Sequence, residues 1–61
     1  MNEDLIDIIA VFEARKELAK VRRYEAMREN NFRVAQVNNE RIEHIDYGLE
    51  IIKEFVENKR K

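Results

Sequence analysis

The feature that most constrains this chain is the near absence of residues that break a helix. Its 61 residues contain no proline and a single glycine, Gly48. Glutamate, lysine, arginine, alanine and leucine, which all favour helix, fill most of the remaining surface-type positions. Because nothing interrupts a helix over long stretches, we predict an all-α protein.

The C-terminal half carries a regular apolar pattern. Apolar residues recur at steps of three, four, three and four residues, at Ile42, Ile45, Leu49, Ile52 and Val56. Such steps place the side chains along one face of a helix, as in the seam of a coiled coil. This half is therefore predicted to pack against another helix.

The pair Asn30-Asn31 is the predicted turn. Asparagine tolerates the left-handed backbone conformation that ends a helix, and it also caps the start of the next one. Asn2 is predicted to cap the first helix. We expect a single domain, residues 1–61, with one helix at about residues 2–29 and a second at about 32–59.

A chain that folds back at this turn places residues whose numbers sum to 61 opposite each other. Apolar residues then meet across most of the hairpin. The pairs are Val56 with Leu5, Ile52 with Ile9, Leu49 with Phe12, Ile42 with Ala19, Ala35 with Ala26, Val34 with Met27 and Val37 with Tyr24. Two positions break the match, because Ile45 faces Lys16 and Asn38 faces Arg23. The register favours an antiparallel two-helix hairpin.

Charge supports the same arrangement. The segments 1–14, 15–33, 34–52 and 53–61 carry net charges of −4, +4, −3 and +2. An antiparallel hairpin brings segments of opposite sign together, although each exposed pair contributes little by itself.

Two alternatives stay open at the level of sequence. Residues 32–37, FRVAQV, alternate in polarity and include β-favouring residues, so they could form a short strand. That strand would need a second copy as its partner, since no other segment of the chain has a strand pattern. A single unbroken helix in a coiled coil is the other alternative, because no glycine or proline forces the turn.

Self-association is expected from the size of the chain. A core this small rarely stabilises a fold alone, and the usual supports are scarce, with no cysteine and one histidine, His44. A second apolar stripe on the first helix has no partner within the hairpin; it comprises Ile8, Val11, Ala14, Leu18 and Val21. We predict that the hairpin self-associates through this stripe into a homodimeric four-helix bundle or a similar small oligomer.

Catalysis is not expected. The chain contains no Ser, Thr or Cys, which excludes the usual nucleophile and base arrangements. Glu40 and His44, one helical turn apart, are too few ligands for a metal site. We therefore expect no enzyme activity, no cofactor, no metal and no small-molecule substrate.

The termini suggest a cytoplasmic protein that does not contact membranes. The N-terminus is acidic where a secretory leader would be basic, and the longest apolar run, residues 8–12, is too short to span a bilayer.

Two functions remain as expectations. The first is a small regulator or adaptor, as in cytoplasmic or phage-type proteins, that binds a protein partner through an apolar helix face or the hairpin tip. The alternative is a dimeric nucleic-acid-binding regulator that uses the basic segment 15–33. The candidate partner or nucleic-acid contacts are Arg15, Lys16, Lys20, Arg22, Arg23, Arg28, Phe32 and Arg33.

Overall fold

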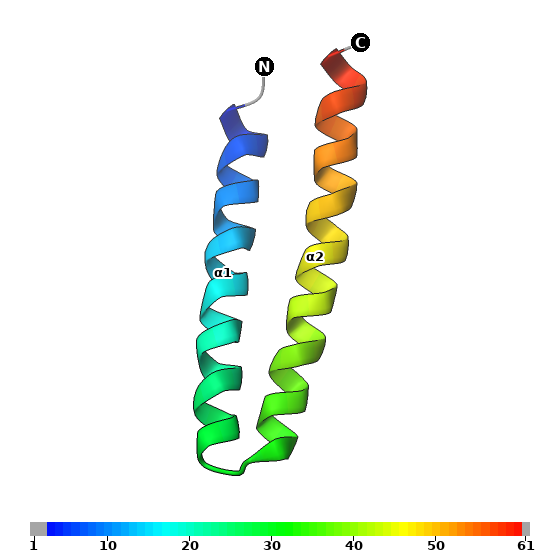
Figure 1. Ribbon diagram of the computed structural model, residues 1–61. Coiled ribbons are helices and arrows are strands. Elements are labelled where there is room, and N and C mark those ends of the chain that lie inside the picture. Colours follow the sequence, from blue (N-terminus) through cyan, green and yellow to red (C-terminus); the bar gives the residue numbers. More distant parts are fainter. Residues whose placement is uncertain (1–2, 61) are drawn as a thin grey trace.

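Two long helices lie side by side as an antiparallel hairpin. The computed structural model describes residues 3–60, with the side chains of residues 4–58. The helices are α1 (Glu3–Arg28) and α2 (Phe32–Arg60) (Figure 1). The Cα atoms extend over 47 × 16 × 10 Å, which makes the hairpin a rod. The expectation of an all-α protein with two packed helices is confirmed, while the Asn2 cap lies outside the described residues.

Backbone hydrogen bonds close the end of α1. Asn30 has a φ of 60°, and it is the one non-glycine residue of the described chain with a positive φ. Its N–H donates to the Met27 carbonyl at 3.1 Å, and the Asn31 N–H donates to the Ala26 carbonyl at 2.7 Å. These two bonds form a Schellman motif, which satisfies carbonyls that the helix end would otherwise leave unpaired.

Asn31 begins α2. Its side-chain Oδ1 accepts a hydrogen bond from the Val34 N–H at 3.3 Å, and its carbonyl accepts one from the Ala35 N–H at 3.1 Å. This is the geometry of an N-cap residue. Residues 32–37 are therefore helical, so the short strand and the single unbroken helix are both wrong.

The core is one narrow seam between the helices. Its buried members are Ala19, Ala26, Ala35, Asn38, Ile42 and Leu49. Leu5, Ile9, Phe12, Ile45, Ile52 and Val56 are half-buried on the same seam. Contacts between the helices join Lys16 to Asp46, Arg23 to Asn39 and Phe12 to Gly48, whose numbers sum to 60–62, so the register is within one residue of the one that the sequence predicts.

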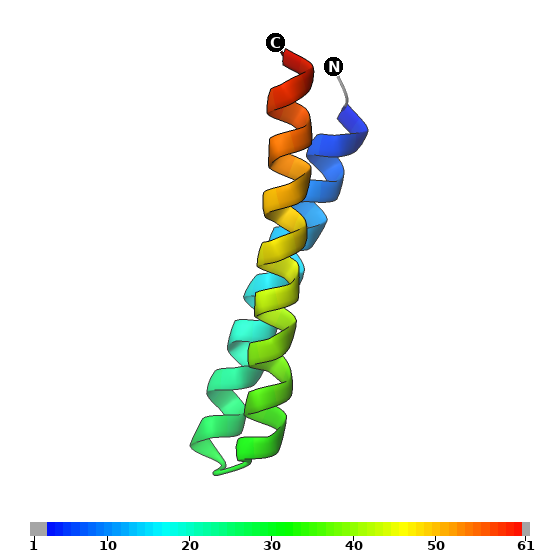
Figure 2. The same ribbon diagram turned by 90° about the vertical axis from the view of Figure 1, so that its right-hand side faces the viewer.

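Side-chain size varies along the seam. Alanines occupy it near the turn, and larger side chains such as Phe12 and Leu49 occupy it toward the termini. Accordingly, the helices lie closest near the turn and diverge toward the termini in Figure 1, and they cross each other in the perpendicular view of Figure 2. Gly48 accommodates Phe12, since a Cβ added at Gly48 would come within 3.2 Å of Phe12 Cε2.

Two of the expected apolar pairs are wrong. Val34, Met27, Val37 and Tyr24 are all exposed, between 42% and 64%. Pairing residues whose numbers sum to 61 gives the position of a residue along the hairpin axis but not the direction of its side chain. Each of these residues stands one position off the seam, and Val34 and Met27 line different grooves.

The two seam positions occupied by basic residues are accommodated by polar contacts at the edge. Lys16 and Arg23 are half-buried, so their aliphatic stems cover the seam. Lys16 Nζ lies 2.5 Å from Asp46 Oδ1. Arg23 Nη1 donates to Asn39 Oδ1 at 2.7 Å.

The left-handed backbone of Asn30 yields a testable prediction. An Asn30→Gly variant should match or exceed the parent in stability, whereas Asn30→Ile should lose about 1–2 kcal/mol, because a β-branched side chain opposes a positive φ. Urea unfolding followed by circular dichroism at one fixed protein concentration measures the difference. Glu29→Ile is the matched control, and equal stability of Asn30→Gly and Asn30→Ile would contradict the turn geometry.

Candidate functional site

One side of the hairpin carries a groove between the helices. The groove holds about 430 Å³, and its lining comprises Arg15, Leu18, Ala19, Arg22, Asn38, Arg41, His44 and Ile45. Leu18, Ala19 and Ile45 supply apolar surface, and the three arginines supply positive charge. We call this surface the arginine groove. Toward the turn it continues past Glu25 and Glu29 to Asn31 and Val34.

The arginines of this groove have no carboxylate partner among the side chains of residues 4–58. Among the described side chains, ion pairs join Lys16 to Asp46, Lys20 to Glu17 and Lys53 to Glu13. None of these ion pairs involves Arg15, Arg22 or Arg41. The charges of these lysines are therefore neutralised by nearby carboxylates. The charges of the groove arginines are left available for an external anion.

Asn38 is an anomaly of the same groove. Its residue surface is only 3% exposed, and its Nδ2 donates to the Val34 carbonyl at 2.9 Å. Its Oδ1 is buried without a hydrogen-bond partner among the described residues. Because an unpaired buried acceptor is costly, this oxygen marks a place where a donor is missing.

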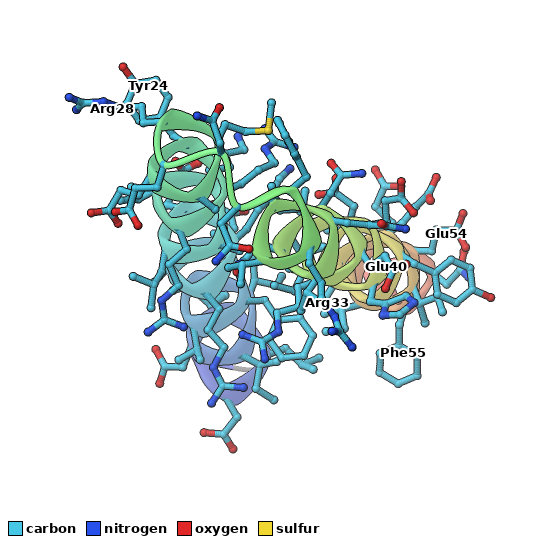
Figure 3. The ribbon with its side chains drawn as sticks, turned by 90° about the horizontal axis from the view of Figure 1, so that it is seen from below. Tyr24, Arg28, Arg33, Glu40, Glu54 and Phe55 are labelled. Atoms are coloured by element: carbon cyan, nitrogen blue, oxygen red, sulfur yellow. The ribbon has the colours of Figure 1, made fainter. Side chains whose placement is uncertain are left out.

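A second hollow lies on the opposite side near the turn. It holds about 640 Å³, and its lining includes Tyr24, Met27 and Phe32 together with Lys20 and Arg23. Tyr24 and Phe32 are 64% and 61% exposed. Arg28 lies over the Tyr24 ring at 5.9 Å from its centroid, and both residues project from α1 in Figure 3. We call this surface the tip patch.

The residues expected at an oligomer interface share the outer side of α1. Ile8, Val11, Ala14, Leu18 and Val21 are all exposed. We call this set the outer stripe. Leu18 also lines the arginine groove, so the stripe and the groove adjoin.

The basic segment is divided by the fold. Arg15 and Arg22 line the arginine groove. Lys16 lies in a mixed-charge hollow on the other side, and Lys20 and Arg23 line the tip patch. Phe32 lies at the tip patch, while Arg28 and Arg33 are exposed near the turn. The expected cations thus do not form one continuous surface.

Sequence reasoning missed a second seam on α2. Val34, Val37, Arg41, His44, Gly48, Ile51 and Phe55 follow alternating steps of three and four residues. Residues at such steps share a helix face, and Arg41 and His44 place this face on the groove side. The steps of three and four residues were present in the sequence, but the polar residues Arg41 and His44 interrupt the apolar pattern.

The described residues were compared with the geometric requirements of a metal site and of a membrane-spanning helix. In the part of the chain that the structure describes, no cluster of three or more His, Asp or Glu side chains is placed to hold a metal ion. Within residues 3–60, neither helix is long and apolar enough to cross a bilayer. Comparison with protein families, curated proteins and solved structures finds no match to this chain.

The unpaired oxygen of Asn38 predicts an unusual mutational response. Asn38→Ala should raise the free energy of unfolding by about 1 kcal/mol, because it removes a buried unpaired acceptor and favours helix. Ile42→Ala, one turn further along the same seam, should lower it by about 2–5 kcal/mol. Urea unfolding at low protein concentration compares the two, and a large loss of stability in Asn38→Ala would show that the amide is satisfied.

Proposed function

We propose that this chain is a small, non-catalytic helical regulator or adaptor that associates with itself and binds a protein partner. The observation that carries the proposal is the exposed outer stripe. Its large members Ile8, Val11, Leu18 and Val21 are between 41% and 54% accessible in the single hairpin. A regular apolar stripe with no intrachain partner is typical of a surface that another helix covers.

The size of the core supports self-association. Of the five buried apolar residues among the described side chains, three are alanines and only Ile42 and Leu49 are large. A large aliphatic side chain contributes about 1.5–3 kcal/mol when fully buried, whereas ordering each residue costs about 1–2 kcal/mol. A seam this narrow gives a lone hairpin little stability, and covering the stripe would supply more.

The tip patch supports a protein partner. Tyr24, Met27 and Phe32 combine aromatic and methionine side chains with nearby Arg23, a composition enriched at protein interfaces. No residue of the outer stripe lines the tip patch, so a partner could bind there while the hairpin is self-associated. This arrangement suits an adaptor.

Nucleic-acid binding is the alternative proposal, and the division of the basic segment argues against it. We expect no mobility shift with single- or double-stranded DNA or RNA at about 0.15 M salt, because the cations of segment 15–33 do not line one groove. A salt-sensitive shift that Arg15→Gln and Arg22→Gln abolish would favour the nucleic-acid alternative instead.

The outer stripe provides the central test. The double variant Leu18→Lys, Val21→Lys should lose the oligomer and much of its helix, because charge replaces apolar side chains worth about 1.5–3 kcal/mol each when buried. Sedimentation equilibrium gives the mass, and circular dichroism at two concentrations gives the midpoint, which should rise with concentration in the parent.

The matched control adds the same charge elsewhere on α1. Glu13→Gln with Glu17→Gln changes two exposed residues that lie off the outer stripe, and it raises the net charge by the same two units. This control should keep the mass and the midpoint of the parent. If Leu18→Lys, Val21→Lys does the same, the stripe is not a contact between copies.

A further inference from the structure

The arginine groove presents a basic, apolar, basic pattern along α1. Arg15 and Arg22 stand on either side of Leu18, at steps of three and four residues, and all three line the groove. Residues seven apart share a helix face and lie about 10.5 Å apart along the axis. Neither arginine has an ion pair with another described residue.

The outer face of α2 presents the complementary pattern. Glu43 and Glu50 stand on either side of Tyr47, at steps of four and three residues. Tyr47 is 68% exposed, and both carboxylates lack an ion pair within the described chain. Glu40 and Glu54 extend this acidic face, and Figure 3 shows both projecting from α2 away from α1.

We propose that the acidic face of one copy docks into the arginine groove of a second copy, with α2 antiparallel to the partner's α1. Arg15 then meets Glu50, Leu18 meets Tyr47 and Arg22 meets Glu43, because each pair of numbers sums to 65. Charge pairs on both sides of an apolar contact fix its register. The inference rests on the proposed self-association and names the surfaces that make it.

The surroundings of the groove disfavour a nucleic acid. Beyond Arg22 the groove continues past Glu25 and Glu29. A strand with evenly spaced phosphates would meet both carboxylates, whereas in the proposed register α2 places one carboxylate, Glu40, opposite Glu25 and the neutral Gln36 opposite Glu29.

The proposed contact is head-to-tail. The arginine groove lies on one side of the hairpin, and the acidic face lies elsewhere on α2. Glu40 and Glu54 project away from α1, and Glu50 borders the mixed-charge hollow on the other side from the groove. Each copy keeps one groove and one acidic face free after docking at the other, so the contact generates rings or open chains larger than a dimer.

A complementary charge reversal tests the contact. The groove variant carries Arg15→Glu with Arg22→Glu, and the acidic-face variant carries Glu43→Arg with Glu50→Arg. Each alone should associate at least about tenfold more weakly than the parent, because two attractive pairs become repulsive. An equimolar mixture should regain association, since the unchanged face of one variant fits the unchanged groove of the other. Sedimentation velocity over a concentration series measures the mass.

Controls separate docking from folding. Arg28→Glu with Arg33→Glu makes the same charge change at exposed positions near the turn and should associate like the parent. Circular dichroism checks that each variant is helical. No gain of mass on mixing, or an equal loss in the control, would overturn the proposal. A parent of constant mass between about 0.05 M and 0.5 M salt would do the same and leave the groove to another acidic protein.

The register allows finer tests. In the proposed register Glu25 meets Glu40, so Glu40→Lys should strengthen association. Tyr47→Ala should weaken it, because the apolar contact with Leu18 is lost. Weaker association of Glu40→Lys, or unchanged association of Tyr47→Ala, would contradict the register.

The two proposals fail in different ways. Val21 belongs to the outer stripe and lies outside the arginine groove. If Val21→Lys dissociates the oligomer while the charge reversals do not, the docking proposal fails and the outer stripe remains the proposed interface. If the charge reversals dissociate the oligomer while Val21→Lys does not, the proposal of an interface at the outer stripe fails and head-to-tail docking remains.

Discussion

When two helices pack as a pair, each can bury only one stripe of its surface against the other. The exposed apolar surfaces of this molecule follow from that limit. The seam is further weakened by its composition, since its buried residues are mostly alanines and one asparagine. Much of the remaining apolar surface of α1 and α2 stays exposed in the single hairpin. The hairpin therefore resembles part of a helical bundle. The outer stripe, the arginine groove and the tip patch are candidate contacts because the seam leaves them exposed.

The sequence predicted the parts of the fold that depend on one helix at a time or on a single register. The seven-residue spacing of Ile42 and Leu49 identified the seam, and the Asn30-Asn31 pair identified the turn, because asparagine fits both a left-handed C-terminus and an N-cap. Side-chain direction was harder to predict. Val34 and Met27 were matched by level, yet they point to different sides, since a helix turns by about 100° per residue and one position off the seam changes the face.

The candidate site was less predictable because it combines residues from both helices. Arg15 and Arg22 were recognised as basic, but their grouping with Arg41 depends on how α1 and α2 cross. Lys16 and Lys20 lie on the other side of α1 from them, where Lys16 pairs with Asp46 of α2 and Lys20 with Glu17 of its own helix. A segment that is uniformly basic in sequence thus becomes two surfaces with different electrostatics.

The tight connection at Asn30 and Asn31 also determines how the hairpin opens. Only three residues link the helices, so the loop-closure entropy is small for contacts next to the turn and grows for contacts further away. The layer of Ala26 and Ala35 closes the shortest loop, and each successive layer closes a longer one. We therefore expect the hairpin to open from its free ends, with the layer of Leu5 and Val56 separating before that of Ala19 and Ile42. Amide hydrogens of the layers nearest the termini would thus exchange with solvent earliest in both helices at once, even though these layers are held by the larger side chains.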